Sequence, residues 1–122
     1  MSGEESRRRG LWGEELAARY LEGKGYRITA RRWRCRFGEL DIVAERGGFL
    51  CFVEVKLRRS ARYGSGAEYV DRRKQEKLRT AAELYLQSFP TGLQPRFDVI
   101  EVLSPNGLGT ENPKIRHIEG AF

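Results

Sequence analysis

The fold is decided by residues 37–56, which read FGELDIVAERGGFLCFVEVK. Two runs rich in β-branched and aromatic residues, 37–46 and 49–58, flank the dipeptide Gly47-Gly48. Such runs on either side of a two-residue glycine turn predict a tight β-hairpin.

The register of the hairpin brings acidic side chains together. With a two-residue turn, Asp41 lies opposite Glu54 and Glu39 lies opposite Lys56. Opposed side chains share a face with Cβ atoms about 4.5–5.5 Å apart, and like charges so placed destabilise the pair. Asp41 and Glu54 therefore need a cation or a shared proton. A four-residue turn keeps this pairing, whereas a three-residue turn with a bulge shifts it by one residue.

The other face of the hairpin is predicted to be apolar, so that burial sets the register. Its members are Leu40, Ile42, Ala44, Cys51, Val53, Val55 and Leu57.

Paired carboxylates indicate a particular class of metal. Hard cations such as Mg²⁺ and Mn²⁺ prefer oxygen ligands, whereas zinc prefers nitrogen and sulfur. Lys56 projects from the same face as Glu54, and this combination suits phosphodiester hydrolysis, in which a lysine stabilises charge on the attacked phosphate. The alternative is an ordinary charged strand face, with Glu39 and Lys56 as a cross-strand ion pair.

Two predicted helices carry further polar residues on their packing faces. In the first, residues 11–24, Glu14 falls on the face of Leu21, where an unpaired carboxylate is costly. In the second, residues 67–88, Lys74 lies inside the apolar arc. Both side chains are expected to reach the acidic site. Alternatively, Glu14 favours the dipole at a helix start, and Lys74 covers apolar surface with its stem.

The remaining segments complete the expected order of elements. They are an extended segment at 26–33, a loop at 59–66, a strand at 96–103, a loop at 104–113 and a short strand at 114–118. Helices packed on a mixed sheet place the chain in the α/β or α+β class. We expect residues 1–10 to be a flexible tail and 11–122 a single domain.

The charge of the chain is unevenly distributed. The 122 residues carry a formal net charge of +6, but residues 27–79 alone hold 15 basic and 7 acidic side chains, a net of +8. A concentrated basic surface attracts polyanions, phosphate backbones first among them. A merely solvated basic face is the alternative.

The cysteine and histidine content argues against zinc, and nothing indicates a membrane segment. The two cysteines, Cys35 and Cys51, lack metal-ligand spacing, and the single histidine, His117, is far from both in sequence. We expect both cysteines to be reduced and buried. No apolar stretch is long enough for a signal peptide or a membrane span, so a cytoplasmic location without membrane contact is expected.

Several motifs, taken in order, resemble one known family. They are Gly13-Glu14, Ala17, Tyr20-Leu21, Gly25-Tyr26, GELD at 38–41, FVEVK at 52–56, Val70 with Lys74, and RFDV at 96–99. This order and spacing resemble the bacterial YraN-like family of uncharacterised, endonuclease-like proteins, over about residues 10–103. That family is placed in the PD-(D/E)xK nuclease superfamily and is similar to archaeal Holliday-junction resolvases.

The resemblance implies a restriction-endonuclease-like fold, a mixed central sheet flanked by helices, with Mg²⁺ or Mn²⁺ bound near the sheet. It implies that Glu14 is the helix-borne acid, that Asp41 and Glu54 bind the metal with it, and that Lys56 is the catalytic lysine. The superfamily's proline before the first aspartate is replaced here by Leu40.

Basic residues flank the predicted site on both sides and are expected to bind nucleic acid. They are Arg31, Arg32, Arg34, Arg36, Arg58, Arg59, Arg62 and Lys74. Arginine forks bind phosphates without reading sequence, and the nearby Trp33 and Tyr63 either stack on unpaired bases or pack in the core.

Three functions follow from these features. The first is a metal-dependent endonuclease that cuts DNA, including branched or structured DNA, for which two symmetric cuts would favour a homodimer. The second is a nucleic-acid-binding module that keeps the acidic site without cutting. The third is a non-catalytic interaction protein with exposed carboxylates.

Overall fold

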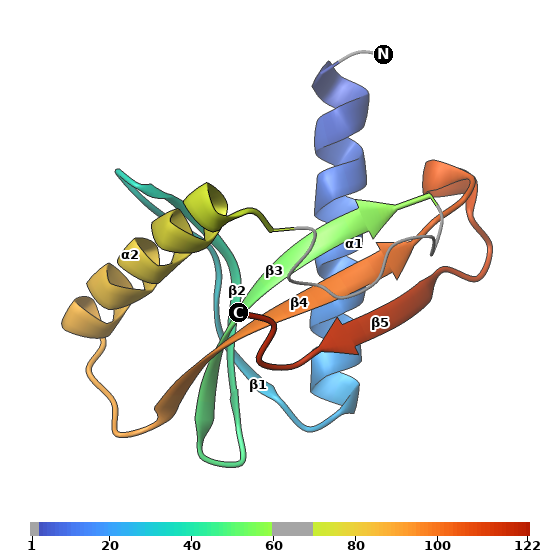
Figure 1. The fold of residues 1–122 in the computed structure, drawn as a ribbon. Coiled ribbons are helices and arrows are strands. Elements are labelled where there is room, and N and C mark those ends of the chain that lie inside the picture. The colour runs from blue at the N-terminus through green and yellow to red at the C-terminus, as the bar shows by residue number, and fades with distance from the viewer. Residues whose placement is uncertain (1–2, 60–69) are drawn as a thin grey trace.

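The computed structural model describes residues 3–59 and 70–122 as a five-stranded mixed sheet with a helix on each face (Figure 1). This confirms the α/β prediction. The elements are α1 Gly3–Gly23, β1 Arg27–Cys35, β2 Gly38–Arg46, β3 Phe49–Arg58, α2 Arg72–Ser88, β4 Gln94–Leu103, the short 3₁₀ helix η2 Gly107–Gly109 and β5 Lys114–Ile118.

The strands lie in the sheet in the order in which they occur in the chain, β1-β2-β3-β4-β5. All neighbours are antiparallel except β3 and β4, which are parallel and joined through α2. The predicted hairpin register is confirmed from Arg46 and Phe49 to Ile42 and Val53. The predicted pairs of Asp41 with Glu54 and of Glu39 with Lys56 lie beyond the end of this ladder. The two glycines of the turn have φ values of 58° and 85°, which residues other than glycine rarely adopt.

Each face of the sheet carries its own core. On the α1 side, Ile42, Ala44, Cys51 and Val53 are buried, as predicted. Leu40 was predicted on that side but packs instead on the α2 side. The prediction of one apolar face was too simple, because the α2 face is equally apolar; there Val43, Leu50, Phe52 and Val99 are buried together with Leu78, Ala81 and Tyr85 of α2.

Both helix starts differ from their predicted positions. α1 begins at Gly3, so residues 3–10, predicted as a tail, are helical. Glu4 and Glu5 in the first turn favour the positive end of the helix dipole, a signal that apolar periodicity does not detect. α2 begins at Arg72 because the carboxylate of Asp71 accepts a hydrogen bond from Lys74 N, which makes Asp71 the N-cap.

Most of the predicted 59–66 loop and residues 67–69 lie outside the described residues.

The cysteines are not paired, and among described residues no helix is long and apolar enough to cross a membrane. Cys51 is buried as predicted, whereas Cys35 is only half-buried.

α1 comes close to the sheet at Gly13. A Cβ atom added there would lie 2.6 Å from Leu57 Cδ1, whereas one added at Gly10, a turn earlier, would meet nothing within 4 Å. The absent side chain therefore lets α1 rest directly on β3 next to Glu14.

We expect Gly13→Val to destabilise the protein by about 1–3 kcal/mol, because the added methyl groups must displace Leu57 or the helix. The matched change Gly10→Ala should stabilise it by about 0.5–1 kcal/mol through helix propensity. Urea denaturation of the three proteins measures both effects. Equal stability of Gly13→Val and the wild type would show that α1 does not depend on this close contact.

A buried carboxylate, that of Asp98, joins the C-terminal part of the chain to the sheet. Asp98 on β4 is fully buried and accepts hydrogen bonds from Arg96 Nε at 2.9 Å, Arg96 Nη2 at 2.8 Å and Gly120 N at 3.1 Å. His117 Nε2 of β5 lies 2.8 Å from the same carboxylate. These hydrogen bonds hold the pKa of Asp98 below its ordinary value despite burial, which opposes them. The network joins β4 to β5 and to the segment after it.

Candidate metal centre

The pairing of β2 with β3 ends just before Asp41, and the carboxylate of Asp41 lies between the two strands. The ladder between the two strands runs from Arg46 and Phe49 to Ile42 and Val53. Beyond it, Val55 N donates a hydrogen bond of 2.9 Å to Asp41 Oδ2 rather than to a strand carbonyl. The side chain thus takes the place of the backbone acceptor, which fixes the carboxylate between the strands.

β1 bends at the same level. Arg32 has a φ of 48°, and it is the one residue other than glycine with a positive φ in the described part of the chain. Its neighbours pair regularly with β2, Arg31 with Ile42 and Trp33 with Leu40, so Arg32 lies across from Asp41. Strained backbone of this kind persists where the surroundings hold it, often at functional sites. Arg32 Nε lies 3.6 Å from Glu14 Oε1.

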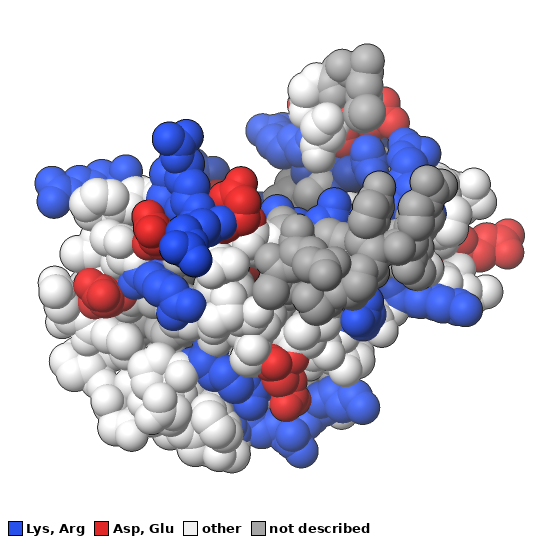
Figure 2. Space-filling view, in the orientation of Figure 1, with Lys and Arg blue, Asp and Glu red and all other residues white. Residues whose placement is uncertain are grey.

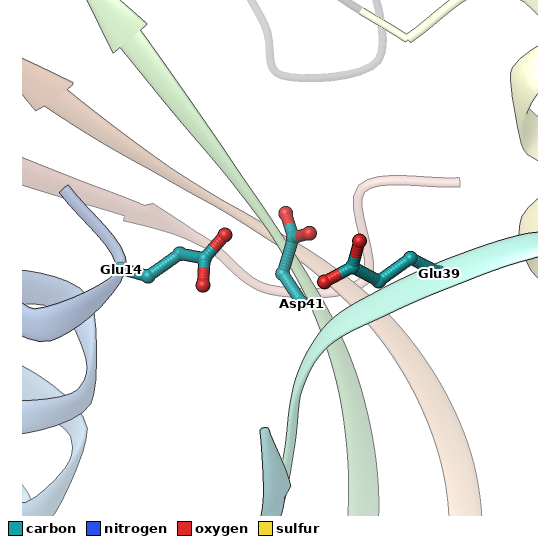
Figure 3. Close-up of side chains that lie close together, drawn as sticks. All are labelled: Glu14, Glu39 and Asp41. Atoms are coloured by element: carbon teal, nitrogen blue, oxygen red, sulfur yellow. The ribbon is translucent and has the colours of Figure 1, made fainter. Parts of the chain in front are cut away.

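Three carboxylates meet at this point. Glu14 from α1 and Glu39 and Asp41 from β2 each offer an oxygen, and these oxygens lie within 4.8 Å of one another. Figure 3 shows the three side chains pointing into one space between α1 and β2. Glu14 lies well inside α1, so the alternative that it merely starts a helix is wrong. The predicted convergence of Glu14 and Asp41 is confirmed.

Burial and mutual repulsion make ionisation of these acids costly. The pKa of Asp41 is raised to about 8, chiefly by burial and next by the negative charge of Glu54, against the hydrogen bond from Val55. The pKa of Glu14 is also raised by burial, although the positive charge of Arg32 opposes this. A bound cation would offset both the cost of burying the charge of Asp41 and its repulsion by Glu54.

Without metal, the stability of the fold is expected to fall as the pH rises from about 5 to about 8. Asp41 has an ordinary pKa of 3.8 and a folded-state pKa of about 8. Between these values the folded state binds more protons than the unfolded state, so each rise in pH favours unfolding. Melting temperatures in EDTA measure this slope, which Asp41→Asn should flatten.

The control for this slope is Glu83→Gln on the exposed face of α2, which should keep the wild-type pH dependence. An Asp41→Asn slope as steep as that of the wild type would mean that other groups cause it.

Glu54 on β3 forms ion pairs with two lysines. Its carboxylate is 5% exposed, and Oε2 lies 3.5 Å from both Lys56 Nζ and Lys74 Nζ. The predicted approach of Lys56 and Lys74 to the site is thus confirmed. Lys56 pairs with Glu54 rather than with Glu39, contrary to the alternative reading of the strand face. Whether Glu54 also binds metal stays a prediction.

Glu39 is a candidate ligand that the sequence analysis did not predict, because the hairpin register placed it opposite Lys56. In the structure Glu39 faces Arg34 across β1, with Arg34 Nε 3.7 Å from Glu39 Oε2. The sequence did contain a signal, because residues two apart on a strand share a face, which puts Glu39 beside Asp41.

The acidic cluster borders an arginine-lined cleft of about 380 Å³. Arg7 of α1 and Arg32 and Arg34 of β1 line it together with Glu14 and Glu39. Arg7 was not predicted, because its segment was interpreted as a tail. A phosphate backbone lying in this cleft would meet positive charge at the rim and carboxylates at one side.

The other predicted basic residues are spread more widely. Arg31 pairs with Glu15 at 3.0 Å, Arg58 lies 3.9 Å from Glu101, and Arg59 is exposed. Arg36 stacks on Phe37, whereas Arg62 and Tyr63 lie outside the described residues.

Trp33 packs against the core. Its ring meets Tyr85 edge-on, with centroids 5.4 Å apart, which agrees with the alternative that Trp33 packs in the core.

Comparison with known proteins places these residues within one family. A family model described as "Uncharacterised protein family UPF0102" matches residues 13–102. A UPF0102 protein of Syntrophomonas wolfei is 49% identical over 118 residues, which cover 96% of this chain and 99% of that protein. A UPF0102 protein of Symbiobacterium thermophilum is 51% identical over 119 residues, which cover 96% of this chain and 98% of that protein. A UPF0102 protein of Myxococcus xanthus is 46% identical over 119 residues, which cover 97% of this chain and 91% of that protein.

Proposed function

The chain belongs to the uncharacterised protein family UPF0102, the family that its motifs resembled, and we propose that it is a metal-dependent endonuclease that hydrolyses phosphodiester bonds in DNA. One observation carries this proposal. Carboxylates from α1 and β2 converge within 4.8 Å beside an arginine-lined cleft. A protein that only binds nucleic acid gains nothing from half-buried acids that repel phosphate.

The donor set suits Mg²⁺ or Mn²⁺. Glu14, Glu39 and Asp41 offer only oxygen, which these hard cations prefer. Glu14 Oε1 is buried and accepts no hydrogen bond from the described residues, so it has a lone pair to offer a cation. When bound, the metal supplies Lewis-acid stabilisation of a phosphate oxygen and a more acidic water.

The two lysines complete the chemistry in this proposal. Lys56 and Lys74 approach Glu54 from β3 and α2, so two ammonium groups lie next to the carboxylates. Positive charge placed in advance stabilises the negative charge that develops on the attacked phosphate. The arginines of the cleft, Arg7, Arg32 and Arg34, would hold the neighbouring phosphates without reading sequence.

The finer assignment follows the resemblance of the motifs. We propose that the protein is a PD-(D/E)xK nuclease, similar to Holliday-junction resolvases, that acts in the cytoplasm on branched or structured DNA. Two symmetric cuts in such DNA would favour a homodimer. The competing function is a nucleic-acid-binding module with a silent acidic site, which the mixed charge of the cleft also permits.

A cleavage assay separates the two functions. Supercoiled plasmid, single-stranded DNA and a four-way junction are incubated with the protein in Mg²⁺, in Mn²⁺ and in EDTA. The endonuclease proposal expects new ends only when metal is present, whereas the binding module shifts the DNA in a gel and leaves it intact. Retention of all activity in Lys56→Ala would contradict the role of that lysine.

The ligand set can be resolved by melting temperature. Saturation at a hundred times Kd adds about 2.7 kcal/mol, which corresponds to a rise on the order of 10 °C for a chain of this size. Glu39→Gln is expected to lose most of the rise that Mn²⁺ causes, because it removes one of the three converging oxygens. Glu45→Gln, on the same strand but paired with Arg27, should keep it.

The same titration tests Glu54. A smaller Mn²⁺ shift in Glu54→Gln than in the wild type supports its predicted role as a ligand. A shift of equal size would mean that Glu54 binds no metal and serves only to position Lys56 and Lys74.

A further inference from the structure

A second groove also borders Glu39. It has a volume of about 170 Å³ and runs between the β1–β2 turn, with Phe37 and Gly38, and the α2 residues Lys74 and Lys77. Glu39 lines both this groove and the arginine-lined cleft. The two hollows therefore meet at Glu39 of the acidic cluster, and a nucleic-acid strand could pass from one to the other.

Phe37 stands at the entrance of this groove with its ring partly in solvent. Its side chain belongs to the turn between β1 and β2 and is 38% exposed, whereas Phe52 and Tyr85 of the adjoining core are buried. Arg36 lies over the Phe37 ring, with Cζ 4.9 Å from the centroid. A guanidinium on an aromatic ring offers a flat, cationic surface, and such surfaces bind the bases of single strands.

The surroundings of Phe37 are positively charged. Figure 2 shows Lys and Arg side chains gathered over the upper end of α2 and the neighbouring tip of the β1–β2 hairpin. Lys74 and Lys77 line the groove from α2, and Lys74 also reaches Glu54. A phosphate bound between these lysines would be next to the metal centre, with its own base near the Phe37 ring.

We propose that this groove binds an unpaired nucleotide next to the phosphate that is cut, with its base stacked on Phe37 and its phosphate held by Lys74 and Lys77. In a continuous duplex the face of each base is covered by its neighbours, so the ring can stack only on a base at a single-stranded segment, a fork or a branch. The groove thus selects structured DNA. The proposal rests on the proposed nuclease function and specifies its substrate.

Equilibrium binding tests the proposal with the full chain in EDTA, so that no cutting occurs. The probes are a fluorescent single-stranded DNA, a splayed fork and a continuous duplex of the same length. Stacking on one base is worth a factor of about 5 to about 150 in affinity. The affinity of Phe37→Ala for the single strand and the fork should fall by that factor. Its affinity for the duplex, in which neighbouring bases cover each other, should fall by less than about twofold. Phe37→Trp should bind the single strand and the fork at least as well as the wild type.

Phe89→Ala is the matched control, because Phe89 is also an exposed aromatic, 51% exposed, but follows α2 and lines neither groove. It should bind all three probes as the wild type does.

The Phe37→Trp protein also reports the stacked base directly. Its indole fluorescence should be quenched more than that of the wild type by an unlabelled fork, and no more than that of the wild type by the duplex.

The failures of this proposal and of the nuclease function can be told apart. Equal affinity of Phe37→Ala and the wild type for the fork, or equal loss on the fork and the duplex, overturns the groove proposal even if metal-dependent cutting is observed. Absence of metal-dependent cutting by the wild type on every probe overturns the nuclease function. The Mn²⁺ shift in melting temperature should be the same in Phe37→Ala and in the wild type.

Discussion

Asp41→Asn is expected to lower metal-dependent cleavage of DNA by about a thousandfold or more, because it removes the carboxylate at the centre of the acidic cluster. A loss of about 4 kcal/mol of transition-state stabilisation corresponds to this factor. Asparagine keeps the shape of the side chain, and Val55 N can still donate to its carbonyl oxygen. The measurement is the initial rate on the preferred DNA substrate in Mg²⁺.

The same substitution should raise stability in EDTA at pH 8, because it ends the repulsion between Asp41 and Glu54. Loss of activity together with a higher melting temperature is characteristic of a functional residue that costs stability. Glu45→Gln on the same strand is the control and should keep its activity. An Asp41→Asn protein that cuts at more than a tenth of the wild-type rate would contradict the assignment.

Asp98→Ala is expected to destabilise the fold by about 3–5 kcal/mol, since it leaves Arg96 and His117 at a buried site without their anion. In melting temperature this corresponds to a loss on the order of 10–20 °C. Urea denaturation in EDTA measures the change.

Glu119→Ala provides the matched control for Asp98. Glu119 also approaches Arg96, at 3.8 Å, but is 57% exposed, so its removal should change stability by less than about 0.5 kcal/mol. A similar small effect of both substitutions would mean that the buried network contributes little. Where Asp98→Ala still folds, the Mn²⁺ shift should persist, because the network and the acidic cluster use different residues.

Most of the fold could be predicted from local sequence. The bounds of β3 and β5 match the prediction, since Gly47-Gly48 marks the start of β3 and a loop with Pro, Gly and Asn precedes β5. The start of α1 was missed because residues 3–10 contain no apolar residue to mark a period. The start of α2 was missed because Asp71 was counted as a helix residue rather than as its cap.

The candidate site could be predicted only in part, because its geometry depends on two bends. Helix periodicity identified Glu14, and strand pairing identified Asp41 and Glu54. The positive φ of Arg32 and the separation of β2 from β3 at Asp41 are not encoded in any strand pattern. At this level of the sheet Leu40 packs on the α2 face and Glu39 lies in the cluster. Pattern and pairing thus identified Glu14 and Asp41 of the acidic cluster and missed Glu39.

The central claim is that the carboxylates of α1 and β2 hold one divalent cation. Electron paramagnetic resonance of free Mn²⁺ measures this directly, because the signal of the hydrated ion falls as the protein binds it. At pH 8 we expect one Mn²⁺ per wild-type chain and none per Asp41→Asn chain over the same range of concentrations. Equal binding by the two proteins, or no binding by the wild type at millimolar Mn²⁺, would contradict the metal centre.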